Sequence, residues 1–439
     1  MDNIKWGCIQ PLTGGMYIGA QNAIGHKAEW IISYPTLNSP VYSASGDDAS
    51  GEKIIDAGNE YHLTQWLKKY DEMPNYYVFH DRKMFQADDD MCPTITTEGG
   101  ETVTMDYAGK DAVDIVVAVP VCSGLSSATI CDAKTKSVRN SNMIWIAKYA
   151  LNTIRPKVYI FENAPRLMGN VGASVREELE QIAKDAGYSI AYYRTDTNLH
   201  DNCQKRPRTF VYFFRWRNED GECAPQLGYE NKKVAVSEFL NRIPKDASQH
   251  FPVPMWPGNK FMWDFIVSKY GDGWRNAMFN RLVDIIVKND LYDEALAYMK
   301  DNIDADWYER MVKVFDHIRY KLSIGKGFYA DCPMICPADH TPAIQFKTIP
   351  NIIHPTEDRV LDMRECLSLM GMPYDFEMYG EPLRVYGKIG QNVPARTAQF
   401  IVSEAVRIVD GWDTVDRSYD DSNALVFDNI KAAKESDKK

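Results

Sequence analysis

Short apolar runs alternate with amphipathic stretches along the first half of the chain, and this pattern predicts its secondary structure. The runs are rich in Ile, Val, Phe and Tyr and are flanked by polar residues, which is typical of strands buried on both faces. They lie at residues 31–34, 76–79, 115–119, 158–161, 189–193 and 210–214. Helical periodicity fits residues 142–153 and 175–186, and Gly187 is suited to end the second helix.

Buried strands joined by helices predict an α/β fold with a doubly wound, mostly parallel sheet, in which the last strand, after Tyr193, runs antiparallel. The alternation stops near residue 218, and an aromatic-rich helical pattern covers residues 259–320. We therefore expect two domains. Residues 1–217 form the first and residues 377–439 complete it, whereas residues 218–376 form the second, with a helical insertion.

Three further segments are predicted from local pattern. Residues 385–390 are expected to form a strand and a glycine turn, followed by an amphipathic helix over residues 395–409. Residues 82–110 indicate a loop insertion. The tail at residues 432–439 is polar and is expected to fray.

Composition narrows the class of protein. The chain has 439 residues, of which 45% are hydrophobic, enough for a large core. It contains no apolar run of about 18 residues and no basic segment followed by an apolar one at its start, so we expect a cytoplasmic protein without a membrane span. Nine scattered cysteines favour reduced thiols. Cys332 and Cys336 lack a second pair at zinc spacing, so no metal site is expected.

Charge alone argues against a nucleic-acid partner, because the formal net charge is −11. The charges are unevenly distributed, however. Residues 205–217 are basic and aromatic, whereas acidic residues concentrate at 88–90 and 410–421. A basic stretch of this kind is, on its own, more often a solvated face than a binding surface.

A candidate nucleophile, Cys122, follows the apolar run at residues 115–119. This places it at the carboxyl end of a central strand, where open α/β sheets bind their ligands. A helix after its small-residue loop could lower the thiol pKa, and the thiolate is the reactive form. A lone cysteine is nevertheless more often an inert buried residue.

Glu162 and Asn163 close the next buried run. A carboxyl group there must be paired or protonated, and when protonated it could donate a hydrogen bond to N3 of a base. The alternative is a strand-end carboxylate without catalytic use. Asn163 is expected to fix the loop through backbone bonds.

Arg206 and Arg208 stand at alternate positions before a strand, where their planar forks could hold a carbonyl oxygen or a phosphate, or simply face solvent. Gly14 and Gly15 could form a turn that admits a nucleotide-like cofactor, although any tight turn would use them.

Together these segments resemble the DNA (cytosine-5) methyltransferase family, in the family's usual chain order. Residues 120–126 resemble its nucleophile loop, residues 161–165 its Glu-Asn-Val element, and Gln204 with Arg206 and Arg208 its Gln-x-Arg-x-Arg element. Residues 353–376 resemble the element that returns from the target-recognition domain, and residues 389–394 the final Gly-Asn-x-Val-Pro element.

Several positions depart from the family pattern. Val121 stands where the family has proline, and Ser123 where it often has glutamine. The first element, usually Phe-x-Gly-x-Gly-Gly, reads Gln-Pro-Leu-Thr-Gly-Gly at residues 10–15, without the aromatic residue and the first glycine. Asp81 is the candidate for the adenine-side carboxylate.

The resemblance implies a Rossmann-like fold dependent on S-adenosylmethionine, and methyl transfer to C5 of a cytosine flipped out of DNA. It implies that Cys122 adds to C6, that Glu162 holds N3 and the exocyclic amine, and that Arg208 holds O2, with Arg206 supporting the loop and a phosphate. The cofactor residues it implies are Gly14, Gly15, Asp81, Pro120, Asn392 and Val393. Asn163 and Gln204 would be structural.

The resemblance also names the domains: residues 218–376 become the target-recognition domain, in which residues 218–350 choose the DNA sequence. We expect a monomeric, stand-alone enzyme of restriction–modification or phage DNA modification, in a bacterial cell or a phage host. Two alternatives stay open. The same scaffold could transfer another one-carbon group or act on RNA, or the chain could be a non-catalytic DNA-binding relative. The intact Cys122, Glu162, Arg206 and Arg208 count against the latter.

Overall fold

The fold was analysed in a computed structural model of the 439-residue chain. The structure describes residues 4–33, 61–79, 94–96, 102–104, 110–120, 125, 138–216, 224–250, 252, 255–271, 273, 281–328, 334–336, 339–344, 352–380, 382–414 and 426–438.

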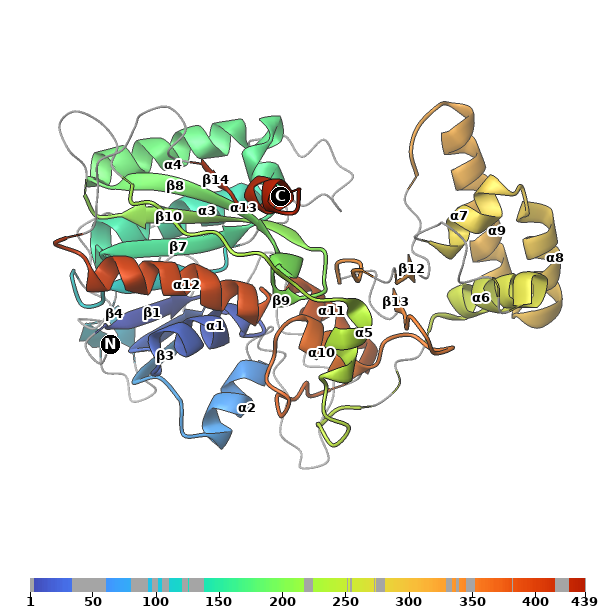
Figure 1. The fold of residues 1–439 in the computed structure, drawn as a ribbon, viewed down its shortest axis with the longest axis horizontal. Helices are drawn as coiled ribbons and strands as arrows, with labels where there is room; N and C mark the ends of the chain where they lie inside the picture. The colour runs from blue at the N-terminus through green and yellow to red at the C-terminus, as the bar shows by residue number, and fades with distance from the viewer. Residues whose placement is uncertain are drawn as a thin grey trace.

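One sheet organises the larger part of the molecule. Among the described residues, eight strands follow the order β14-β8-β10-β7-β6-β1-β2-β3 (Figure 1). They are β1 (Trp6–Ile9), β2 (Trp30–Ser33), β3 (Tyr76–Phe79), β6 (Ile115–Ala118), β7 (Val158–Asn163), β8 (Ser189–Asp196), β10 (Pro207–Phe214) and β14 (Val426–Asp428). All the pairings are parallel except those of β10 with β7 and β8. The predicted parallel sheet and its antiparallel strand are confirmed.

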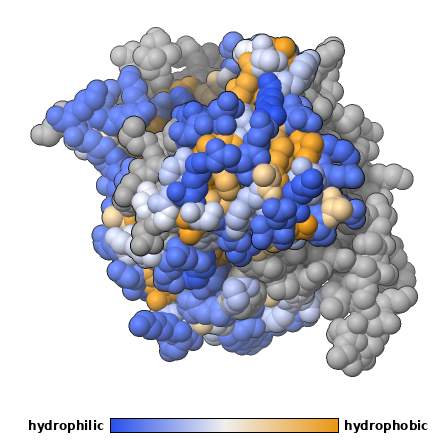
Figure 2. All heavy atoms as spheres, turned by 90° about the vertical axis from the view of Figure 1, so that its right-hand side faces the viewer, coloured by the Kyte–Doolittle hydropathy of each residue, from blue (hydrophilic) through white to orange (hydrophobic). Residues whose placement is uncertain are grey.

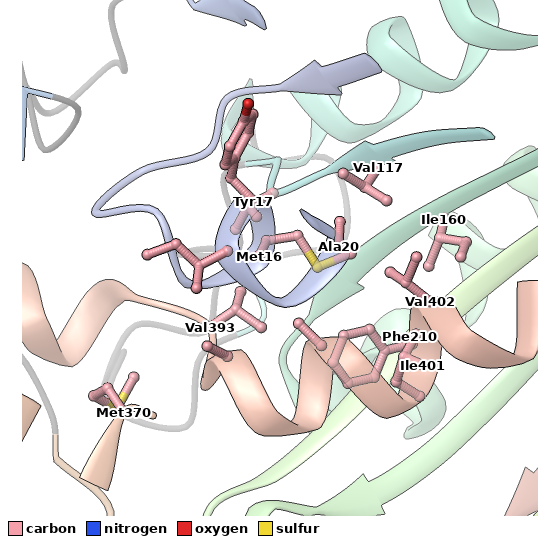
Figure 3. Close-up of a cluster of buried hydrophobic side chains, with 14 of the residues drawn as sticks. Met16, Tyr17, Ala20, Val117, Ile160, Phe210, Met370, Val393, Ile401 and Val402 are labelled. Atoms are coloured by element: carbon pink, nitrogen blue, oxygen red, sulfur yellow. The ribbon is translucent and has the colours of Figure 1, made fainter. Parts of the chain in front are cut away.

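Helices cover both faces of this sheet because its strands are apolar on both sides. Helices α1 (Gly15–Ile24) and α12 (Ala395–Asp410) pack on one face, over a core that includes Val117 and Phe210 (Figure 3). Helix α3 (Val138–Lys148), its π-helical continuation Tyr149–Ile154 and α4 (Ala173–Ala186) cover the other face. Gly187, at φ +77°, ends α4 as predicted.

A helical cluster with its own core stands apart from the sheet in Figure 1. It contains α6 (Pro257–Tyr270), α7 (Leu282–Lys288), α8 (Tyr292–Asn302) and α9 (Ala305–Ser323), within the predicted helical region. Strands β12 (Met334–Ile335) and β13 (Ile352–Ile353) lie at its base, and Ile353 joins its core. The proposed domain boundaries stay a prediction.

Between the sheet and this cluster lie β9 (His200–Asn202) and three further helices (Figure 1), and β11 (Lys232–Lys233) pairs with β9. The helices are α5 (Val236–Asn241), α10 (Met363–Leu369) and α11 (Pro382–Gln391). Met370 and Tyr386 belong to the same core as helices α1 and α12, so the core beneath the sheet extends into this region.

Three local predictions are wrong. Residues 385–390 belong to helix α11, because Tyr386 and Ile389 are spaced to bury one helical face and Pro382 suits a first helical position. Inside the expected loop insertion, Thr-rich β4 (Thr94–Thr96) and β5 (Thr102–Thr104) pair antiparallel.

The tail is the third, since it forms helix α13 (Asn429–Ser436). The side chain of Asp428 caps this helix by accepting from Lys431 N at 3.1 Å, and Ala433 is buried. Strand β1 was also missed, because Gly7 interrupts its apolar run; a Cβ there would lie 2.2 Å from the Trp30 ring. In the described part of the chain, no helix has the length and apolarity needed to cross a membrane.

Candidate active site

The site lies where the connections of the sheet reverse direction. Strand β1 is flanked by β2 on one side and by β6 on the other, and all three run parallel. In an open α/β sheet, ligands bind at the carboxyl ends of the strands at such a switch point. Three segments predicted from the sequence meet there: the loop after β1, Pro120 after β6, and Glu162 at the end of β7.

The loop from β1 to α1 has an unusual backbone. Gln10 and Leu12 both have φ of +55°, and Gly14 has φ of +112°. Leu12 stands where the family pattern has its first glycine, and it adopts the left-handed conformation that glycine adopts freely. For a residue with a side chain this conformation costs about 1–2 kcal/mol. The backbone shape is therefore present although that glycine is missing.

The C-terminal segment holds this loop in place. Asn392 Oδ1 accepts from Gly15 N at 2.8 Å, so a residue distant in sequence caps helix α1. A Cβ on Gly15 would lie 1.8 Å from Val393 O, which shows how closely the two segments approach. Thr13 Oγ1 donates to Lys388 O at 3.0 Å. Asn392 and Val393 are both buried and contact the loop from β1 to α1.

Glu162 and Arg208 form an ion pair at the carboxyl end of β7. The Arg208 Nε to Glu162 Oε1 distance is 2.6 Å, and the side chains are 19% and 5% exposed. The pair forms because β10 runs antiparallel beside β7, with Phe210 opposite Glu162, two residues from Arg208. A guanidinium therefore compensates the carboxyl group in this buried place.

Arg206 is turned away from this pair. Its guanidinium donates to the backbone carbonyls of Ile344 at 2.5 Å, Gly390 at 2.8 Å and Asn392 at 3.0 Å. Its backbone N donates to Asp196 Oδ1 at 2.6 Å. Burial raises the pKa of Asp196, and the Arg206 bond opposes that rise. Since Arg206 is 2% exposed, its guanidinium links its own segment to residue 344 and to residues 390–392 from inside the protein.

Gln204 and Asn163 fix neighbouring loops. Gln204 Nε2 donates to Leu369 O at 2.9 Å, and its Oε1 accepts from Ile344 N at 3.2 Å. Asn163 Oδ1 accepts from Ala164 N at 2.9 Å, at the start of the turn after β7. The proposed nucleophile Cys122 and the proposed adenine-side Asp81 lie outside the described residues.

A hydrogen-bonded network next to Arg208 could not be recognised from the sequence. Thr195, the partner of Arg208 across β8 and β10, lies 2.6 Å from His200 Nε2, and His200 Nδ1 lies 2.7 Å from Glu230 Oε2. Burial alone would raise the pKa of Glu230, but His200 and Lys232 together lower it. Asn429 of α13 donates to Thr195 Oγ1 at 3.0 Å. The network ties the C-terminal helix to the strand that flanks Arg208.

The comparison with known families decides the class of enzyme. The model of the C-5 cytosine-specific DNA methylases matches residues 88–407, which include Glu162, Arg206 and Arg208. The chain belongs to this family. As a cytosine methyltransferase it takes its methyl group from S-adenosylmethionine. The match does not include the loop at residues 10–15, so the cofactor role of that loop stays a prediction.

Individual relatives are distant. A protein of Methanocaldococcus jannaschii named as a type II methyltransferase is 20% identical over 313 residues, which cover 68% of this chain and 79% of the relative. A crystal structure described as a DNA modification methyltransferase encoded within an E. coli prophage has a TM-score of 0.50 at 13% identity, covering 93% of this chain and 100% of that chain. The Entamoeba histolytica methyltransferase EhMeth has a TM-score of 0.49 at 11% identity, covering 94% of this chain and 99% of that chain.

The residues at the switch point of this cytosine methyltransferase fit the methyl donor. Side chains on Gly14 and Gly15 would meet Leu63 and Val393 O, so glycine keeps the loop narrow. The N-terminus of a ten-residue helix, α1, favours an anionic group such as the donor's carboxylate.

Proposed function

We propose that this enzyme methylates C5 of cytosine in DNA through a covalent bond between Cys122 and C6. The observation that carries the proposal is the buried Glu162–Arg208 pair, beside the end of the strand that leads to Cys122. A carboxyl and a guanidinium side by side match the N3, amine and O2 edge of a cytosine ring. The ring must leave the duplex to reach them.

The reaction assigns one task to each side chain. The Cys122 thiolate adds to C6, forming a C–S bond and placing electron density on C5. Glu162 hydrogen-bonds N3 and the exocyclic amine, which stabilises the ring as it becomes an enamine, and Arg208 holds O2. S-adenosylmethionine would supply the electrophilic methyl group for C5, and the bond from that methyl to the sulfonium sulfur would break to leave S-adenosylhomocysteine. A base then removes the C5 proton, and the C6–S bond breaks to restore the thiolate and the ring.

Other residues support these groups. Arg206 acts as a positioning residue, because its guanidinium donates to backbone carbonyls of residues 344, 390 and 392. Asn392 and Val393 shape the cofactor loop by capping and packing on Gly15. We propose Asp81 as the carboxylate on the adenine side of the cofactor, and Pro120 as a residue that lines the cofactor site.

We further propose that residues 218–350 choose the DNA sequence. Their helical cluster exposes aromatic side chains, with Trp256 49% and Tyr320 60% exposed. Arg310 lies 4.9 Å from the ring centroid of Trp307, which contacts Trp256 edge-on. Figure 2, which turns this side to the viewer, shows apolar side chains gathered among hydrophilic ones. Aromatic and basic groups together suit base edges and phosphates.

The segment is tested by exchange. Residues 218–350 are replaced by the corresponding segment of a relative with a known target, and modified cytosines are sequenced genome-wide. The modified context should become that of the donor relative. A context unchanged from the parent enzyme would place sequence choice elsewhere.

A mechanism-based trap tests the chemistry. DNA with 5-fluorocytosine in place of cytosine is incubated with enzyme and S-adenosylmethionine, and RNA substituted in the same way is incubated in parallel. Because fluorine replaces the C5 proton, elimination stops and a covalent adduct should survive a denaturing gel with DNA. Cys122→Ala should form no adduct, whereas the control Cys332→Ala should. An adduct with RNA alone would contradict the DNA substrate.

A further inference from the structure

Helix α2 (Tyr61–Lys69) contacts the cofactor loop on one side. Leu63 and Leu67 are fully buried in the core that also contains Met16 and Tyr17 of α1. A Cβ on Gly14 would lie 2.7 Å from Leu63 Cδ1, so this leucine limits where the loop can sit.

The other side of α2 contacts residues 373–379, which we name the 373–379 loop. His62 Nδ1 accepts from Tyr379 N at 3.0 Å, and the two rings stack at 6.3 Å with an angle of 7°. Trp66 Nε1 donates to Asp375 Oδ1 at 3.4 Å, and Lys69 Nζ lies 3.2 Å from Asp375 Oδ2.

His62 and Leu63 are adjacent in one helix, so the two contacts cannot move independently. A displacement of the Gly14 loop that shifts Leu63 must also shift His62, and with it the backbone of Tyr379. The 373–379 loop is in turn fixed to α10, because the buried Arg364 donates to Pro373 O at 2.9 Å and to Phe376 O at 3.4 Å.

We propose that α2 couples binding of S-adenosylmethionine at the Gly14 loop to the position of the 373–379 loop, with His62 and Leu63 as the positioning residues. Binding of the methyl donor thereby restrains the loop before nucleic acid arrives. Coupling of this kind requires an element whose equilibrium both sites bias, and α2 is the element in contact with both.

Hydrogen exchange of the whole protein, without nucleic acid, tests the coupling. S-adenosylhomocysteine at a concentration of about 100 times its Kd should slow amide exchange by up to about a hundredfold wherever local opening of the structure is coupled to binding. In the native protein, amides of α2 and of the 373–379 loop should both slow. In His62→Phe, which removes the acceptor but keeps a ring, α2 should still slow while most of the slowing in the 373–379 loop is lost.

Two further variants make the result decisive. Lys68→Ala, on the exposed side of α2, should behave like the native protein. Asp375→Ala removes the acceptor for Trp66, Lys69 and Tyr70 at a half-buried position, and it decides the question if His62→Phe does not fold. The proposal is overturned if hydrogen exchange in the 373–379 loop does not slow in the native protein. It is also overturned if exchange there slows as much in His62→Phe and Asp375→Ala as in the native protein. A missing covalent adduct with DNA would refute the proposed function but leave this result unaffected.

Discussion

At the scale of single residues, the two arginines before β10 have different surroundings. Arg208 faces Glu162 at 2.6 Å, whereas Arg206 donates to three carbonyls and is 2% exposed. Their alternate spacing in the sequence would suit two residues that share one role, so the sequence spacing alone does not separate them. These contacts fit the proposed catalytic role of Arg208 and the proposed positioning role of Arg206.

Glu162→Gln should keep the fold and binding of S-adenosylmethionine but lose turnover. The amide cannot supply the proton that the carboxyl group provides to the ring, so methyl transfer should fall on the order of a hundredfold or more. Single-turnover transfer to unmethylated bacterial genomic DNA measures this. Glu177→Gln, at an exposed position on α4, is the matched control. Native turnover in a folded Glu162→Gln protein would exclude a catalytic role.

Arg206→Ala should lower stability and not only activity. It leaves three carbonyl groups without this donor in a buried place, and it should cost about 3 kcal/mol or more of unfolding free energy. Denaturant unfolding measures the loss, and Lys205→Ala at the exposed neighbouring position should change it little. A protein of native stability that loses only kcat would instead favour the phosphate contact that the resemblance implies for Arg206.

At the scale of elements, helix α1 depends on a segment far along the chain. Its N-cap residue, Gly14, has no side chain, and Asn392 supplies the capping oxygen. The close approach of Gly15 to Val393 permits this arrangement. Neither contact is visible in the sequence, because no periodicity or local propensity links residues so far apart.

Asn392→Ala should therefore leave the loop from β1 to α1 less ordered. Loss of an N-cap costs about 1 kcal/mol, and the less ordered loop should bind S-adenosylmethionine several-fold more weakly. Calorimetric titration measures the affinity. Gln391→Ala, at the exposed neighbouring position, is the control. Equal affinities in the two variants would show that the cap does not order the site.

The Thr195–His200–Glu230 network should make the stability of the protein depend on pH through its contacts with β8. Since the folded-state pKa of Glu230 is lowered, its contribution to stability is present above the unfolded-state pKa and is lost as pH falls through the folded-state pKa. Glu230→Gln should flatten the acid side of the stability curve. Urea unfolding at a series of acidic pH values tests this, and curves of identical slope would contradict it.

At the scale of the whole molecule, the sheet was predictable and parts of its surroundings were not. Strands such as β6 and β7 can be recognised in the sequence as apolar runs, and Glu162 could be placed because it ends one of them. Helix α11 was mistaken for a strand and turn because its glycines resemble turn signals, while its buried face becomes clear only against the core. The contacts of α2 could not be predicted, because they join segments about 300 residues apart.

The central claim is that this enzyme methylates cytosine in DNA through Cys122. Mass spectrometry of nucleosides from the DNA and RNA of a host that expresses the native chain or Cys122→Ala tests it most directly. The account predicts 5-methyldeoxycytidine above background with the native chain and background levels with the variant. Methylated cytidine in RNA alone, or equal 5-methyldeoxycytidine with both proteins, would contradict it.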